Sequence, residues 1–380
     1  MNIYADNAAT TRMSKKALYE MNYHLENSFA NPSSSYMMGQ NARRILDKAR
    51  EDIAGVIGAS PREIIFTSGG SEGDNQAIVS AARLGAASGK KHIVSSSFEH
   101  HAVLNTLKAL EKQGYEITLL DVHPDGIVRP EEVEKAIKDS TALVSIMYAN
   151  NETGTLQPID EIGKICKKKG VLFHTDAVQA LGHVPVNVEN IDLLSASAHK
   201  FHGPKGTGFL YAKKGIRLTS LILGGAQERG QRAGTENLPA ICAMACALKE
   251  AAENMEESKE IMTKARDLII KGLSQIEGAN LNVDAKKRLP GHINFSFEDI
   301  AGESLLILLD QKGICASSGS ACMSGSLDPS HVLLAMGQSP PLASGALRLT
   351  IGADITEEQT DYIIKTVKET VEYLRSFKRK

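Results

Sequence analysis

Four segments of the 380-residue chain combine residue types that bind an anion, stack on a ring or supply a reactive amine. The first is the glycine-rich turn Ser68-Gly69-Gly70-Ser71. Its glycines let the backbone approach a ligand closely, and the helix that follows would offer free N–H groups to a phosphate. The turn is neither a Walker A loop nor a GxGxxG fingerprint, so a plain tight turn is an equally good interpretation of this segment alone.

The other three segments each follow or end an apolar run. His100 follows HIVSSS, Asp176 lies near the end of VLFHTDA, and Lys200 follows IDLLSAS. A histidine there can stack on a ring or move protons, or simply cap a helix. A carboxylate that ends an apolar strand costs desolvation energy unless a cation pairs with it, and a ligand can be that cation. A lysine in such a place, followed by glycine, can be desolvated into a reactive amine.

Alternating strand-like and helix-like segments must position these residues. Short strands are predicted at 63–67, 92–97, 116–122, 142–149, 171–177, 191–197 and 206–214, and helices at 38–57, from about 76, and at 99–114. This alternation predicts a largely parallel sheet covered on both faces. Ligands of such sheets bind beyond the carboxyl ends of the strands, so the four segments should meet at one edge.

A smaller α+β region is predicted after about residue 240. Its elements are long helices over 238–276, strands at 292–297 and 346–352, and helices at 302–313 and 356–376, the last with a capping pattern. We therefore predict an α/β protein with a large domain over 13–255. The smaller α+β domain would combine 1–12 with 256–380.

Composition excludes several classes of protein. Lys and Arg number 43 against 45 Asp and Glu, and this net charge of −2 argues against nucleic-acid or membrane-surface binding. Five cysteines are too few for a disulfide framework and fit a reducing cytoplasm. We expect no signal peptide and no membrane-spanning helix, because no run approaches ~18 apolar residues. We also expect no metal site, since Cys242 and Cys246 have no acidic or histidine partner near them in sequence.

The four strand ends together match what pyridoxal phosphate requires: a phosphate site, a partner for the ring face, an anion for the pyridine nitrogen and a Schiff-base lysine. At this point the chain also resembles the cysteine desulfurases of the NifS/IscS type. These are pyridoxal-phosphate enzymes of aminotransferase class V, with the fold type I of aspartate aminotransferase. The resemblance covers essentially the whole chain, from YADNAATT to LRLTIG, and is most specific in SAHKFHGPKG and SSGSACMSG.

The resemblance implies a role for each matching residue. Lys200 matches the Schiff-base lysine, Asp176 the partner of the pyridine nitrogen, and His100 the stacking histidine, which also moves protons. Cys322 matches the nucleophile that accepts the substrate sulfur as a persulfide. Further cofactor contacts are implied for Gly70, Ser71, Asn151, Gln179, Ser197, Ala198, His199 and Thr235. Asn151 and Arg348 match the clamp on the substrate carboxylate, where an arginine fork binds bidentately.

The implied reaction turns L-cysteine into L-alanine and passes sulfur to an acceptor protein, in iron–sulfur cluster assembly or in thiolation of tRNA or cofactors. Thr235 matches a phosphate contact donated by a second subunit, which implies a homodimer. Two alternatives are a related aminotransferase or lyase without sulfur chemistry, and a sulfur-relay docking platform. Three positions depart from the usual family pattern: Gly70-Ser71 replaces Ala-Thr, Tyr36 replaces His, and Met323 replaces Thr or Ser.

Overall fold

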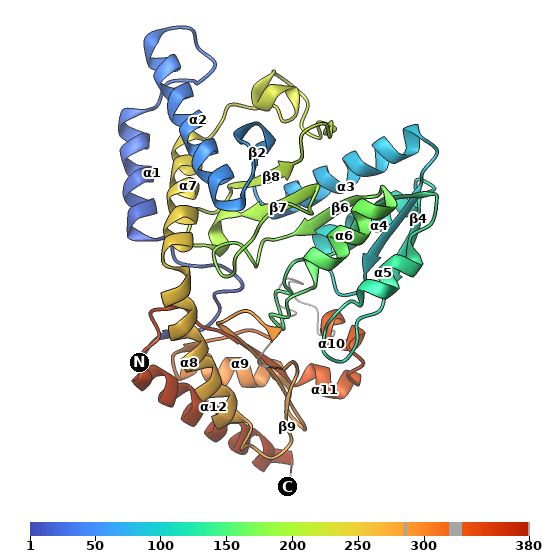
Figure 1. The fold of residues 1–380 in the computed structure, drawn as a ribbon. Coiled ribbons are helices and arrows are strands. Elements are labelled where there is room, and N and C mark those ends of the chain that lie inside the picture. The colour runs from blue at the N-terminus through green and yellow to red at the C-terminus, as the bar shows by residue number, and fades with distance from the viewer. Residues whose placement is uncertain (285–286, 319–328, 379–380) are drawn as a thin grey trace.

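The computed structural model describes residues 1–284, 287–318 and 329–378, and its strands form one large and two small sheets (Figure 1). The large sheet has seven strands. Their spatial order is β2 (Ile64–Thr67), β8 (Gly208–Ala212), β7 (Leu193–Ser197), β6 (Leu172–Asp176), β5 (Thr141–Ser145), β3 (His92–Ser96) and β4 (Glu116–Leu120). The predicted strands therefore exist, and they belong to one sheet.

The large sheet is parallel except at β8, which runs antiparallel to both of its neighbours. Only residues 198–207 connect β7 to β8, which is too short for the crossover that a parallel neighbour requires. β2 and β7 consequently point the same way as the other parallel strands. The segments that follow them meet at one edge, as the sequence predicted.

Helices cover both faces of this sheet. In the large unit they are α1 (Lys15–Asn27), α2 (Met37–Ile57), α3 (Gly70–Ala87), α4 (His101–Glu111), α5 (Pro130–Ala136), α6 (Ile159–Lys169) and α7 (Leu238–Glu253). Alternate residues of β2 enter different cores: Ile64 and Phe66 pack with α2 and α7, whereas Ile65 packs with α3 and α4. This period of two is what a strand buried on both faces requires.

α3 begins at Gly70, six residues before the helix start predicted near Gln76. The glycine-rich turn therefore forms the first turn of the helix itself. The Glu72 carboxylate accepts a hydrogen bond from the N–H of Ser68 at 2.7 Å, which stabilises the helix start. Prediction from the glycines alone missed this side-chain interaction.

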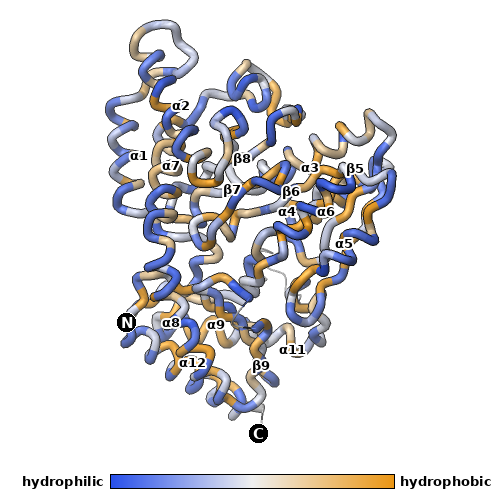
Figure 2. The backbone as a smooth tube through the Cα atoms, viewed as in Figure 1, coloured by the Kyte–Doolittle hydropathy of each residue, from blue (hydrophilic) through white to orange (hydrophobic). Residues whose placement is uncertain are grey.

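A second unit contains the two small sheets. Its elements are β1 (Ile3–Tyr4), α8 (Met255–Leu273), β9 (Ala279–Leu281), β10 (His292–Phe297), α9 (Gly302–Gln311), β11 (Ile314–Cys315), α10 (His331–Ala335), α11 (Pro340–Ser344), β12 (Ala346–Thr350) and α12 (Glu357–Lys378). Hydrophobic and hydrophilic residues alternate along α12 (Figure 2), and Ile363 and Val367 from its apolar face enter a core separate from those of the large sheet.

Ile3 and Ala5 also belong to this second core, because β1 pairs with β11. Val332, Leu333 and Ala343 of the second unit pack instead in a core of the large sheet, so the division into 13–255 and a unit made of 1–12 and 256–380 stays a prediction. Every helix in the described part of the chain is too short or too polar to cross a membrane.

Candidate active site

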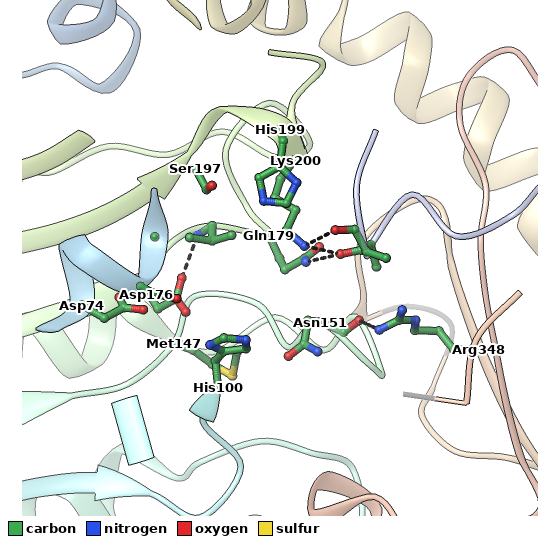
Figure 3. A pocket seen from close by; sticks show the side chains of 15 residues that line it. Asp74, His100, Met147, Asn151, Asp176, Gln179, Ser197, His199, Lys200 and Arg348 are labelled. Carbon is green, nitrogen blue, oxygen red and sulfur yellow. Dashed lines mark hydrogen bonds between the residues drawn. The ribbon is translucent and has the colours of Figure 1, made fainter. Parts of the chain in front are cut away.

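A cavity of about 290 Å³ lies at the carboxyl edge of the large sheet, between the two units (Figure 3). This volume suits a small molecule, since such sites typically measure roughly 300–1,000 Å³. Most of the residues predicted for the site line the cavity: Gly70, Ser71, His100, Asn151, Asp176, Gln179, Ser197, His199, Lys200 and Arg348. Residues far apart in sequence thus share one site.

The amine of Lys200 lies against the backbone of the N-terminal segment. Its Nζ donates to the carbonyl oxygens of Ala8 at 2.6 Å and Ala9 at 2.8 Å (Figure 3). The Gln179 amide also donates to the Ala8 oxygen, at 2.9 Å. His199 contacts the hydroxyl of Thr10 at 3.1 Å. Residues 8–10 therefore form one wall of the site and hold three side chains at it.

Asp176 is a buried carboxylate at the floor of the cavity. Its Oδ1 accepts the N–H of Val178 at 2.9 Å. Burial raises the pKa of Asp176 to about 6, against the opposing effects of that hydrogen bond and of the Lys200 charge. A cation beside this carboxylate would lower the pKa again and compensate the cost of burying the charge. The pyridinium of pyridoxal phosphate is such a cation.

Three further buried groups surround Asp176, and sequence reasoning did not single them out. Asp74 of α3 lies close enough that one oxygen of each carboxylate and one ring nitrogen of His100 are all within 4.8 Å of one another. Burial, and then the charge of Asp176, raise the pKa of Asp74 well above its usual range. Burial likewise raises the pKa of Glu99 to about 8. Glu99 thus holds its proton at neutral pH, and the surroundings of Asp74 favour its neutral form.

The neighbouring His174 adds no positive charge to this group of carboxyls at neutral pH. Its Nε2 lies 3.6 Å from Asp74, but burial lowers the pKa of His174 to about 3, so the contact is not an ion pair. Asp176, whose pKa of about 6 lies below neutral pH, carries negative charge there. The signal that could have identified Asp74 is its place in the first turns of a helix that begins at the sheet edge.

His100 has two roles in the structure. Its Nδ1 accepts the N–H of Ala102 at 3.1 Å, so it caps α4, and its ring also faces the cavity (Figure 3). Burial, followed by the charge of Lys200, lowers the pKa of His100 to about 4. The ring is consequently neutral near pH 7, and the bond at Nδ1 places its proton on Nε2.

Arg348 is a buried cation that faces the opposite end of the cavity. It is 2% exposed, and its guanidinium donates to Asp6 Oδ1 at 2.7 Å and to the Asn151 carbonyl at 3.1 Å. Its Nε–H is buried and has no hydrogen-bond partner among the described residues. An unsatisfied buried donor on a cation fits a carboxylate ligand. Asp6, which orients Arg348, was not predicted from the sequence.

The N-terminus of α3 forms a cradle that only glycine permits. A Cβ atom on Gly70 would lie 2.5 Å from Val178 Cγ2. The 18-residue helix that starts there presents free N–H groups and the positive end of its dipole to the cavity. With Ser71 and Ser197 beside it, this end of the site fits a phosphate group. The described residues thus fit phosphate, ring, amine and carboxylate in one cavity, as pyridoxal phosphate with an amino-acid substrate requires.

Two predicted site residues of the described part of the chain lie elsewhere. Ala198 is fully buried and its N–H donates to the Thr207 carbonyl at 3.0 Å, so it does not line the cavity. Thr235 is exposed and lines a different hollow, together with residues 28–32. Cys322, like Met323, lies outside the described residues.

Comparison with known proteins agrees with this geometry. The family model described as Aminotransferase class-V matches residues 3–363. The cysteine desulfurase IscS of Methanosarcina thermophila is 49% identical over 376 residues, which cover 98% of this chain and 93% of that protein. The IscS of Clostridium botulinum is 47% identical over 378 residues, covering 98% and 95%.

Two solved structures are also similar. A NifS-like protein superposes with a TM-score of 0.92 at 40% identity, covering 98% of this chain and all of that one. SspA, solved in complex with cysteine, superposes with a TM-score of 0.81 at 36% identity, covering 92% and 99%. The chain therefore belongs to the class-V aminotransferases, a pyridoxal-phosphate-dependent family, and within it to the cysteine desulfurases of the NifS/IscS type.

Proposed function

We propose that this protein converts L-cysteine to L-alanine and retains the sulfur as a persulfide on Cys322. The observation that carries the proposal is the single cavity in which Lys200, Asp176 and Arg348 face one another. Bound pyridoxal phosphate would withdraw electrons from the substrate carbon next to the amino group. Relatives named cysteine desulfurase, and the SspA structure with cysteine, support L-cysteine as the substrate.

The surroundings of four cavity residues indicate their roles in the reaction. Arg348, held by Asp6 and assisted by Asn151, binds the substrate carboxylate. The Lys200 amine, placed among backbone carbonyls, moves protons to and from the substrate carbon. Asp176 would keep the nitrogen of bound pyridoxal phosphate protonated, and the neutral His100 ring would supply a partner for the cofactor ring.

Cys322 would act after the substrate has bound. Its thiol takes the sulfur of L-cysteine, so that L-cysteine and the enzyme thiol become L-alanine and the enzyme persulfide, with atoms and electrons balanced. The sulfur then passes to an acceptor protein of iron–sulfur cluster assembly or of a thiolation pathway. The free thiol state of the four described cysteines supports a reducing, cytoplasmic location.

A homodimer is part of this proposal. Thr235 is exposed and remote from the cavity of its own chain, as expected if it contacts the phosphate in a second subunit. Phe29, which lines the same hollow as Thr235, is 74% exposed, and two further large apolar side chains are exposed, Met37 by 66% and Leu223 by 85%. Such side chains gather at interfaces between subunits.

The decisive experiment compares Cys322→Ser with Cys315→Ser, a matched change at an exposed cysteine of β11. Wild type and Cys315→Ser should release alanine and sulfide in equal amounts from L-cysteine with a reductant. Cys322→Ser should still change the cofactor absorbance when L-cysteine is added, yet release no sulfide. Equal sulfide release by all three proteins would contradict the proposal. A change of absorbance without alanine would favour an aminotransferase or lyase.

A further inference from the structure

An ion pair joins the phosphate end of the cavity to a distant segment of the chain. Glu72, next to Ser71, accepts hydrogen bonds from Arg232 Nε at 3.0 Å and Nη2 at 3.4 Å. The same carboxylate accepts the N–H of Ser68 at the start of the glycine-rich turn. Glu72 thus links Arg232 to both ends of the glycine-rich turn, to Ser68 through a hydrogen bond and to Ser71 through the chain itself.

This ion pair is partly buried and charged on both sides. The Glu72 side chain is 11% exposed and that of Arg232 is 23% exposed. Burial alone would raise the pKa of Glu72, but the hydrogen bonds from Arg232 and Ser68 outweigh it and lower the pKa overall. The carboxylate is therefore ionised at neutral pH, and the pair is a charge-assisted interaction rather than a screened surface contact.

The segment that carries Arg232, residues 219–235, is fixed to α3 a second time. The Gln76 amide, 1% exposed, donates to the Gln231 carbonyl at 2.7 Å and to the Thr219 carbonyl at 3.2 Å. Gln231 and Arg232 are thus bound to two successive turns of the helix whose N-terminus forms the phosphate cradle.

The other side of the same segment is held by α2 and by strand β2, whose Phe66 N–H donates to the Glu228 carboxylate at 3.0 Å. Arg50 forms a buried, bidentate pair with Glu228, at 2.8 and 2.7 Å. Glu228 and Arg229 have φ angles of 44° and 58°, in the left-handed region that favours glycine. Such backbone persists only where surrounding contacts impose it, and it clusters at functional sites. The 219–235 segment is therefore held in a single conformation at some cost.

Thr235 lies three residues after Arg232, is exposed, and lines a hollow other than the cavity described above. The N–H of Gly234 beside it donates to the Gln227 side chain at 3.1 Å, which continues the fixed geometry to the exposed threonine. Arg232 consequently lies between the phosphate turn of its own subunit and the residue proposed to reach the phosphate of the second one.

We propose that Arg232 is a positioning residue for two cofactor sites at once: through Glu72 for the site of its own subunit, and through the backbone to Thr235 for the site of the partner subunit. This inference rests on the homodimer of the proposed function. A residue that acted only on its own subunit would affect one site. The proposal instead predicts that an Arg232 substitution in one subunit speeds the loss of cofactor from both sites.

Hybrid dimers with one wild-type and one variant subunit, each with a different affinity tag, test this. The loaded dimer is dialysed against cofactor-free buffer for increasing times, and borohydride then fixes the remaining cofactor on Lys200. The subunits are separated after denaturation, and cofactor fluorescence gives the amount retained at each site. With Arg232→Gln in one subunit, both sites should lose cofactor about five- to tenfold faster, as loss of one hydrogen bond of ordinary net strength suggests.

Two one-sided controls calibrate the result. Ser71→Ala should affect only the subunit that carries it, and Thr235→Ala only its wild-type partner. Arg232→Lys, which retains a charged donor to Glu72, should restore part of the retention at both sites, and the dimer mass should stay unchanged.

If Arg232→Gln affects one site or neither while Thr235→Ala still acts across the dimer, the role of Arg232 is wrong and the homodimer stands. If Thr235→Ala has no effect on its partner, the proposed dimer contact fails and this inference fails with it.

Discussion

His174, which is buried beside Asp74, should make the free energy of unfolding depend on pH. The size of this dependence follows from how strongly burial shifts the pKa of His174. His174 Nδ1 and Nε2 contact the hydroxyls of Ser145 at 2.8 Å and Ser195 at 3.0 Å, and burial lowers its pKa from 6.5 to about 3. Below pH 6.5 the His174 side chain therefore binds a proton in the unfolded chain, whereas in the folded protein it binds one only near pH 3. The stability that neutral His174 contributes is complete above pH 6.5 and is lost as the pH falls toward 3.

A pH of 5 lies about 1.5 units below the pKa of histidine in the unfolded chain. Since each unit corresponds to about 1.4 kcal/mol, the protonation of unfolded His174 lowers the unfolding free energy by about 2 kcal/mol at this pH. We expect His174→Asn to be less stable than wild type at pH 7, but to lose about 2 kcal/mol less between pH 7 and pH 5. Urea unfolding at both pH values, at one protein concentration and without cofactor, measures this double difference.

His123→Asn is the matched control, because the His123 side chain is 40% exposed and contacts the Glu132 carboxylate at 3.1 Å, so it is not desolvated as His174 is. This variant should not reduce the loss of unfolding free energy between pH 7 and pH 5. If His174→Asn loses as much stability as wild type between the two pH values, His174 is not the neutral buried group described above. If the slope of unfolding free energy against urea differs between the proteins, the midpoints would not be comparable, so equal slopes are part of the expected result.

Three further predictions concern the site and the thiols. Asp176→Asn should lower turnover by orders of magnitude, whereas Asp74→Asn, the same change at a neighbouring carboxyl whose pKa is raised by burial and by the Asp176 charge, should lower it far less; alanine release from L-cysteine compares them. Borohydride should fix the cofactor on Lys200, and Lys200→Ala should abolish this adduct; peptide mapping to another lysine would refute the assignment. Iodoacetamide should modify exposed Cys315 well before buried Cys166, since burial raises the pKa of Cys166 to about 12; a mass-spectrometric time course that gives the reverse order would contradict this.

The sequence predicts the strands and the edge at which the site forms because both follow from local patterns. Apolar runs of about four to eight residues mark strands, and the chemistry-bearing residues come directly after them. The pattern alone therefore places Asp176, Lys200 and His100 at strand ends. The sequence also predicts the strand over GTGFLYAKK, but its antiparallel direction was not predicted.

The residues that the sequence did not reveal act through contacts across long separations. Asp74 sits in a helix and looks like an ordinary polar position until burial beside Asp176 changes its protonation. Asp6 lies 342 residues from Arg348 in sequence, so no local pattern relates the two. Cys322 was found only because of the resemblance of SSGSACMSG, and its placement in space stays a prediction.

The backbone carbonyls of residues 8 and 9 that hold the lysine have a consequence for how the protein is made. Lys200 is 192 and 191 residues away from them in sequence, and Asp6 meets Arg348 only when 342 more residues have been synthesised. At about 5–20 residues per second, the N-terminal segment waits roughly 17–70 s on the ribosome before its last partner emerges. The large sheet can fold meanwhile, but its cavity keeps one wall missing. Cofactor capture should therefore be one of the final events in biogenesis, and a nascent chain that pauses before residue 348 would remain unable to retain it.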